Sequence, residues 1–169
     1  MTAKTARRKP LRKSASKFIF LEAGADGLDR IQPLWQKLTD HHARMSLRFA
    51  KAAGLRTFEA RKQELLAKTA ADRIRVDLVS TDANGPVIAY CVGTVTSAGV
   101  GEIDSIFIEE HWRCRRIGTE LMRRALAWLD KMGAASKVVS VMCENEAAMA
   151  FYRRFDFHPR AVLLQQVAP

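Results

Sequence analysis

The chain has 169 residues, 48% of them hydrophobic and 27% charged, which fits one globular domain with a full core. No apolar run approaches the length of a membrane span, and no apolar segment follows the basic N-terminus, so neither a membrane protein nor a secretory signal is expected. Three widely spaced cysteines, Cys91, Cys114 and Cys143, form no metal-ligand pattern. They favour a reducing, cytoplasmic location, and no metal site is expected.

The net charge of +10 is concentrated at the N-terminus. Residues 1–17 contain seven basic residues and no acidic residue, whereas the other 21 basic and 18 acidic residues leave the rest of the chain at +3. Such a run is typical of a solvated, disordered arm. It also allows contact with nucleic acid or an anionic surface, and such binding would weaken steeply as the salt concentration rises. We therefore expect an arm over residues 1–17 and a single domain over residues 18–169.

The first predicted elements are a strand and two helices. Residues 17–22 (KFIFLE) read as a strand, and an amphipathic helix then runs to about Met45. Pro33 falls in the first turn of this helix, where proline is tolerated. A second helix runs from Phe58 to about Ala70. The apolar positions of the first helix recur at helical spacing: Leu28, Ile31, Leu34, Trp35 and Leu38.

Two strands joined by a turn are predicted next. Residues 74–80 alternate apolar side chains with Arg75 and Asp77, which is the pattern of a half-buried strand. Asn84-Gly85 is a hairpin signal, and residues 87–95 read as the second strand.

The C-terminal half is arranged around a strand at residues 102–108 and the amphipathic helix that follows it. The pattern then predicts a short buried strand at 137–142, a helix at 145–155 and a last extended piece at 157–167. The resulting order, β-α-α-β-β-β-α-β-α-β, is α/β with a mixed sheet and parallel pairing around the crossover helix. The apolar face of that helix comprises Ile117, Leu121, Ala125, Trp128, Leu129 and Met132.

A compact basic segment, residues 113–119 (RCRRIGT), lies where this helix begins. The first N–H groups of a helix have no intrahelical acceptor, and the helix dipole makes that end positive. Arg113, Arg115 and Arg116 add three like charges there, which is unfavourable without an anion, and Gly118 lets an anion approach the backbone. The segment therefore predicts a phosphate site. Two readings of Cys114 within it are open, a reactive thiol and an inert thiol in a packed turn, and the second is favoured.

This segment resembles the acyl-CoA pyrophosphate loop of the GNAT superfamily of N-acetyltransferases, Gln/Arg-x-x-Gly-x-Gly/Ala. Arg113 matches the first position and Gly118 the last, while Arg116 stands where the first glycine is usual. An arginine there is strained if the position needs a positive φ, and harmless if the position is helical. A second segment, residues 145–157, is similar to the family's Asn-x-x-Ala-x-x-Phe-Tyr-x-x-x-Gly-Phe, with Asp156 in place of the glycine.

The resemblance implies a GNAT-like fold, a mixed and mostly antiparallel central sheet flanked by helices, with acetyl-CoA as co-substrate. It implies that Ile106, Phe107 and Ile108 lie along the pantetheine arm. Asn145 would contact the same arm, and by its type it also fits a helix N-cap. The loop residues that would hold the pyrophosphate are Arg113, Cys114, Arg115, Arg116, Ile117, Gly118 and Thr119.

The resemblance also supplies catalytic candidates. Tyr152 lies on a normal apolar helix face by its spacing, and by resemblance its hydroxyl is the general acid facing the CoA sulfur. Glu102 aligns with the glutamate that acts as base in some histone-acetylating members, and Asp104, two residues on, projects to the same side of its strand. His41 and His42 lie toward the expected acceptor wall, where at most one of the two adjacent side chains would face the site.

The sequence thus predicts an N-acetyltransferase that passes acetyl directly to a primary amine of a small molecule or peptide, in a ternary complex. The oxyanion would be stabilised by backbone N–H groups near Phe107 and Ile108. Many relatives are dimers, so a homodimer fits the resemblance. Two other classes stay open: a non-catalytic acyl-CoA-binding regulator, and a nucleic-acid-associated protein that acts through residues 1–17.

Overall fold

The computed structural model describes residues 18–45 and 56–166, so the predicted arm at residues 1–17 lies outside the described residues. Five strands form one sheet in the order β1-β2-β3-β4-β5. The first four are antiparallel neighbours, and β4 and β5 are parallel, joined by the crossover helix as predicted. The strands are β1 (Ile19–Ala23), β2 (Ile74–Ser80), β3 (Ala89–Val95), β4 (Val100–Ile108) and β5 (Ser136–Val139).

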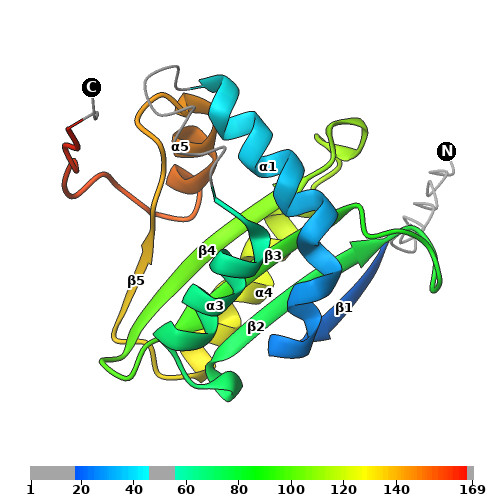
Figure 1. Cartoon of the computed structure of the whole chain (residues 1–169), viewed down its shortest axis with the longest axis horizontal. Helices are drawn as coiled ribbons and strands as arrows, with labels where there is room; N and C mark the ends of the chain where they lie inside the picture. Colours follow the sequence, from blue (N-terminus) through cyan, green and yellow to red (C-terminus); the bar gives the residue numbers. More distant parts are fainter. Residues whose placement is uncertain (1–17, 46–55, 167–169) are drawn as a thin grey trace, which may run out of the picture.

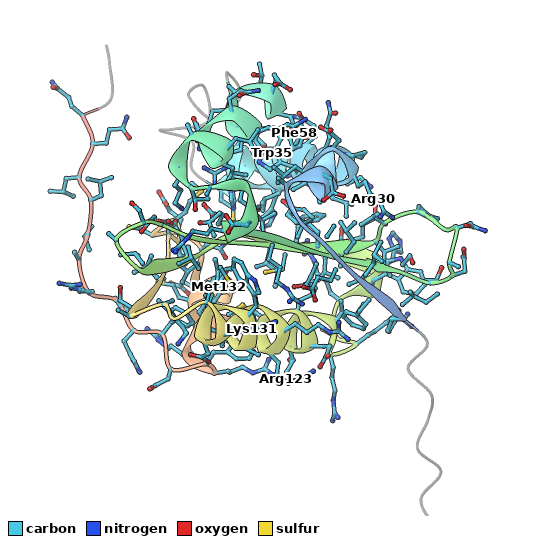
Figure 2. The ribbon with its side chains drawn as sticks, turned by 90° about the horizontal axis from the view of Figure 1, so that it is seen from below. Arg30, Trp35, Phe58, Arg123, Lys131 and Met132 are labelled. Carbon is cyan, nitrogen blue, oxygen red and sulfur yellow. The ribbon has the colours of Figure 1, made fainter. Side chains whose placement is uncertain are left out.

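Helices cover both faces of this sheet. Seen edge-on, α1 and α3 lie on one side and α4 on the other, with Trp35 and Phe58 above the sheet and Met132 below it (Figure 2). The α-helices are α1 (Gln32–Met45), α3 (Phe58–Lys68), α4 (Ile117–Lys131) and α5 (Glu146–Arg153), and the 3-10 helices are η1 (Ala25–Ile31), η2 (Ala71–Arg73) and η3 (Glu110–Trp112). The predicted first helix therefore begins as η1, and Pro33 falls in the first turn of α1 as expected.

Two apolar clusters form the core, one on each face of the sheet. Leu28, Trp35 and Phe58 pack against Val76 and other side chains on the α1 and α3 face. The buried stripe of α4 packs on the opposite face through Ile117, Leu121, Met122, Ala125 and Leu129. Each of the larger of these buried side chains, the isoleucine, leucines and methionine, contributes roughly 1.5–3 kcal/mol of transfer free energy.

The prediction that β2 is half-buried was wrong. Arg75 is 9% exposed and Asp77 is 0% exposed, because helices lie over both faces of the strand. The two side chains satisfy each other: Nε of Arg75 donates to Asp77 at 2.6 Å and Nη2 at 2.8 Å. Glu22 of β1 forms a further ion pair with Arg75 at 2.9 Å. A buried pair of this kind is tolerated only when its hydrogen bonds are complete.

Two further predictions, at the C-terminal end, were also wrong. The strand expected at 137–142 is not buried: β5 is a four-residue edge strand, and Val138 is 39% exposed. No strand forms in the described part of the piece expected at 157–167, up to residue 166. Leu163 and Leu164 there are 89% and 88% exposed, since no neighbouring strand takes them up.

Candidate active site

The sheet opens beside the second half of β4. β5 pairs with β4 only from Val100 to Ile103, and β4 continues alone on that side to Ile108. In Figure 1, the chain that follows β5 diverges from β4 and runs up toward α5. A register shift opposite Val92 and Gly93 places a bulge in β4 before this open stretch. The edge of β4 over residues 104–108 therefore faces the gap between the two strands instead of a fifth-strand partner.

The open stretch joins the two faces of the sheet. Phe107 belongs to the cluster on the α1 and α3 face, whereas Ile106 and Ile108 pack against the α4 cluster. A linear molecule lying along this edge would thus be reachable from both sides. The three residues predicted to line the pantetheine arm are the ones that form the edge.

The N-terminus of α4 points into the same region without a cap. Its N-cap position is Arg116, which makes no side-chain hydrogen bond to the helix. By contrast, Thr57 caps α3 by accepting from the Ala60 N–H at 3.2 Å, and Asn145 caps α5 by accepting from the Ala148 N–H at 2.9 Å. The N-cap role considered for Asn145 is therefore confirmed. The first N–H groups of α4 remain available to an anion.

Arginines surround this helix start without carboxylate partners. Arg113, Arg115, Arg116 and Arg154 form no ion pair with any residue that the structure describes. Aromatic rings support two of them: the Arg115 guanidinium lies 5.1 Å from the Trp112 ring centroid, and that of Arg154 5.8 Å from Phe151. Nη2 of Arg154 also donates to Oγ1 of Thr119 at 3.1 Å.

The acid in the first turn of α4 does not neutralise this cluster. Glu120 accepts hydrogen bonds from Arg123 and Arg124, farther along the helix, at 2.7–2.9 Å. The bond from Arg123, with that from Arg124, lowers the pKa of Glu120 to about 2. Unpaired positive charge at an uncapped helix start is the arrangement that a phosphate group would complete.

The Arg113 side chain contacts the end of β4. Its Nε donates to the Ile108 carbonyl at 3.1 Å, and its guanidinium lies 5.8 Å from the Phe107 ring centroid. Sequence reasoning grouped Arg113 with Arg115 and Arg116 as one phosphate loop. The structure places its side chain at the junction of that loop and the cavity described below.

The loop has two non-glycine residues in the left-handed region, Cys114 at φ 59° and Arg116 at φ 64°. Arg116 is therefore the strained alternative of the two considered from sequence. Asp156, which replaces the glycine of the second motif, also has a positive φ, 64°. Cys114 is exposed, so the expectation that it lies in a packed turn was wrong.

Gly118 serves close packing at this loop. A Cβ built on it would lie 3.2 Å from Cδ1 of Ile108 and 3.3 Å from the ring of Phe151. That spacing is tight, so the glycine lets the start of α4 approach both the end of β4 and α5. The close approach brings the helix N-terminus to the open edge of the strand.

Tyr152 lies on the α4 side of the sheet, 7% exposed, in the cluster that includes Ile106 and Ile108. Its ring packs at the edge of Phe151 and Phe157, with centroids 5.4 Å and 6.0 Å away. Burial raises the pKa of Tyr152 above its ordinary value, and the charges of Cys91 and Tyr90 add to this. The phenol therefore stays protonated across the physiological range, as a proton donor requires.

Glu102 and Asp104 lie on the same face, as predicted, but both are engaged by α3. Nζ of Lys68 bridges them, at 2.6 Å from Glu102 and 2.8 Å from Asp104. Asp104, whose side chain is 1% exposed, also accepts from Arg61 at 3.0 Å and from Thr94 at 2.5 Å. Burial alone would lower the pKa of Lys68, but the hydrogen bonds to Asp104 and Glu102 raise it. The two carboxylates thus hold α3 against the bulge of β4.

A cavity of about 530 Å³ opens on the α1 side of the β4 end. Phe107 forms part of its wall, and the cavity therefore adjoins the open edge of β4. His41 lines it and His42 does not; that at most one of the two faces the acceptor site stays a prediction. The other lining residues are Lys37, Asp40, Arg44, Glu109, Glu110, His111 and Arg113.

The surroundings of His41 favour its neutral form. Burial lowers the pKa of His41 below its ordinary 6.5, the charges of Arg113 and Arg44 lower it further, and Glu110 opposes them. A neutral imidazole at this position can accept a proton.

Sequence reasoning missed Arg154 and most of the cavity wall. Arg154 lies inside the second motif, two residues after Tyr152, where only the motif letters were considered. Lys37, Asp40, His41 and Arg44 are spaced i, i+3, i+4 and i+7, a polar face of α1 that helical periodicity contains. This polar face was missed because only apolar residues were tested for helical periodicity.

Within the described residues, no group of three or more His, Cys, Asp or Glu side chains could hold a metal ion. No helix in this part of the chain is long and apolar enough to span a bilayer. Cys91, Cys114 and Cys143 are all free thiols.

Comparison with known proteins places this geometry in a family. The model of the acetyltransferase (GNAT) family matches residues 35–157. An uncharacterized N-acetyltransferase of Methanocaldococcus jannaschii is 32% identical over 72 residues, which cover 43% of this chain and 32% of that protein. The chain therefore matches about a third of the length of this relative.

Solved structures share the fold at low identity. The aminoglycoside N-acetyltransferase AAC(6')-Iy, in complex with the bisubstrate analogue CoA-S-monomethyl-acetylneamine, is 16% identical with a TM-score of 0.63, covering 88% of this chain and 97% of that one. An acetyltransferase of the GNAT family from Staphylococcus aureus Mu50 is 8% identical with a TM-score of 0.63, covering 82% of each chain. The family model spans residues 35–157 of 169, and the chain therefore belongs to the acetyltransferase (GNAT) family of enzymes.

Proposed function

We propose that the chain transfers an acetyl group from acetyl-CoA directly to a primary amine held in the same complex. The observation that carries this proposal is the uncapped, arginine-flanked N-terminus of α4 beside the open edge of β4. The amine nitrogen bonds to the thioester carbonyl carbon as the C–S bond breaks. The amine loses one proton and the departing thiolate gains one, so two proton-handling groups are needed.

We assign the binding of the co-substrate to two segments. Residues 115–119, with Arg154, would hold the pyrophosphate at the helix start, and Cys114 lies in the same turn. Ile106, Phe107 and Ile108 would lie along the pantetheine arm and offer backbone N–H groups to the developing oxyanion. Asn145 is engaged as the cap of α5 and would reach the arm only with its remaining hydrogen-bonding capacity.

We assign the general acid to Tyr152. Its ring packs in the same cluster as Ile106 and Ile108, on the side of the open edge opposite the cavity. The amine would approach from the cavity and the thiolate would be protonated from the α4 side. The group that accepts the proton of the amine and the group that protonates the thiolate would then lie on opposite sides of the open edge.

Three side chains are proton-acceptor candidates. Glu102 lies five residues before Phe107, which is about 16 Å along a strand, so Glu102 or Asp104 would need a chain of waters. Both also share Lys68. His41 lines the cavity itself, and we favour it as the base.

The test is acetylation by the full chain with acetyl-CoA, measured as acetylated amine by mass spectrometry. The acetylated amine is measured because thiol reagents, which detect released CoA, would also react with the exposed Cys114 and Cys143. Turnover that falls in Tyr152→Phe supports the enzyme reading, and CoA binding without turnover of any amine favours the non-catalytic regulator. The free cysteines support a reducing, cytoplasmic location. A homodimer remains a prediction, to be checked by light scattering.

A further inference from the structure

The cavity beside Phe107 carries unpaired charges of both signs. Lys37 and Glu109 pair with each other across its rim. The other four charged side chains of the wall, Asp40, Arg44, Glu110 and Arg113, form no ion pair with any described residue.

Two of these charges lie on one helix at a spacing that allows a pair. Asp40 and Arg44 are i and i+4 on α1, a separation at which opposite charges usually attract. Asp40 instead accepts a hydrogen bond from the neutral amide of Gln36 at 3.1 Å. Arg44 is exposed and lines the cavity, and among the described residues no carboxylate pairs with its guanidinium.

The opposite wall repeats this arrangement. Glu110 and Arg113 are three residues apart and joined through the backbone, where the Arg113 N–H donates to the Glu110 carbonyl at 3.1 Å. Their side chains do not pair. Arg113 is instead fixed toward the cavity by its bond to the Ile108 carbonyl and by the Phe107 ring.

A polycation would find little net attraction in such a wall, because each acid has an arginine close by. A molecule with one cationic and one anionic group would satisfy charges of both signs without leaving either unpaired. His41, held between Arg44, Arg113 and Glu110, is in position to take a proton from the ammonium group of that molecule.

We propose that the acceptor is a zwitterionic amine of the amino-acid type, whose carboxylate binds Arg44 and Arg113 and whose amine lies against Asp40, Glu110 and His41. This rests on the proposed function and specifies its substrate class. The products are an N-acetylated amino acid, free CoA and one proton: the ammonium group gives its first proton to His41, which releases it to solvent, and the second proton lost from nitrogen is matched by the one that the thiolate gains. The carboxylate takes no part in the bond change and serves to orient the amine.

The test uses the full chain, acetyl-CoA and matched acceptors. Each amino acid is compared with the amine left when its carboxylate is removed, and spermidine and neamine represent polycations. We expect the best amino acid to exceed its decarboxylated partner in kcat/KM by about tenfold or more, the scale of one charge-assisted hydrogen bond. A polycation or a decarboxylated amine as best acceptor would overturn the proposal.

Substitutions locate the effect. Arg44→Gln should raise the KM for the amino acid, while the KM for the decarboxylated amine stays unchanged. The ratio of the two kcat/KM values should therefore move toward one. Arg30→Gln is the matched control, because Arg30 is also an exposed arginine and lies in η1, outside the cavity wall (Figure 2). An unchanged ratio in Arg44→Gln would count against the proposal.

Binding separates this proposal from the proposed function. With CoA present, saturation-transfer NMR should show contact with the amino acid and a weaker signal from its decarboxylated partner, even in a chain that turns over no amine. Such a result would overturn acetyl transfer but keep the zwitterion site. Turnover of an amine together with equal binding of both ligands would keep acetyl transfer but overturn the zwitterion site.

Discussion

Arg116 and Asp156 occupy positions where glycine would be free of strain, at φ 64° each. An L-residue in the left-handed region costs roughly 1–2 kcal/mol, less for aspartate than for arginine. We predict that Arg116→Gly raises the free energy of unfolding by about 1 kcal/mol, measured by urea denaturation. The sequence could flag this position but could not decide its φ, which depends on how the loop meets the helix.

The same change elsewhere should have the opposite sign. Arg123 lies in α4 with 67% of its side chain exposed. Arg123→Gly should lower stability by about 1 kcal/mol, because glycine is a poor helix former. Loss of stability in both variants would show that the loop is not strained at Arg116.

Tyr152→Phe should lower kcat with little change in the KM for acetyl-CoA. The phenyl ring keeps the packing against Phe151 and Phe157, whereas the proton donor is lost. General acid catalysis is worth roughly 10²–10⁴-fold, and we expect the lower part of that range because water can substitute. Steady-state kinetics with saturating acceptor measures the effect, and an unchanged kcat would remove Tyr152 from the chemistry.

The pH profile tests His41. Its pKa is lowered by burial and by the charges of Arg113 and Arg44, so the imidazole is neutral and able to accept a proton until the pH falls below 6.5. We predict that kcat/KM has an acid limb with a midpoint below 6.5, which is lost in His41→Gln. Removing a neighbouring charge in Arg113→Gln should move that midpoint upward. An acid limb that survives in His41→Gln and disappears in Glu102→Gln would assign the role of general base to the Glu102 carboxylate.

At the scale of elements, Asp104 fastens α3 to the bulge of β4. Asp104→Ala leaves Lys68 and Arg61 without their shared, buried acceptor. Breaking a buried pair costs about 3–5 kcal/mol, and we expect about 3 because both cations keep some solvent. Glu102→Gln, at a 23% exposed side chain, should cost less than about 1 kcal/mol. The free energies of unfolding of the two variants, measured by urea titration, should therefore differ clearly. Equal losses of stability would contradict the anchoring role of Asp104.

The elements themselves were largely predictable, and their surroundings were not. Apolar periodicity located both long helices and the strands from β1 to β4, because each follows a local pattern. From the sequence, Arg75 and Asp77 were predicted to lie on a solvent-exposed face of β2, although α4 covers that face. The apolar run at 137–142 read as buried, although β5 is an edge strand. Burial depends on which elements become neighbours, and that information is not local.

At the scale of the whole molecule, the sheet separates the two proposed half-sites, and both adjoin the open edge of β4. The α4 side holds Tyr152 and the helix start, and the α1 side holds the cavity. Motif spacing predicted the first half-site, since its residues lie close together in the sequence. The second combines α1 with residues some 65 positions later, such as Phe107 and Glu110, so only the folded chain brings it together.

The most direct test of the account is calorimetric titration of the full chain with acetyl-CoA and with acetyl-pantetheine, which lacks the pyrophosphate and nucleotide. We predict that acetyl-CoA binds at least tenfold more tightly, as roughly one charge-assisted contact requires. The Arg115→Gln/Arg154→Gln double variant should lose this advantage while its affinity for acetyl-pantetheine is unchanged. Equal affinity for the two ligands, or no binding of acetyl-CoA, would contradict the assignment of the α4 N-terminus as the pyrophosphate site.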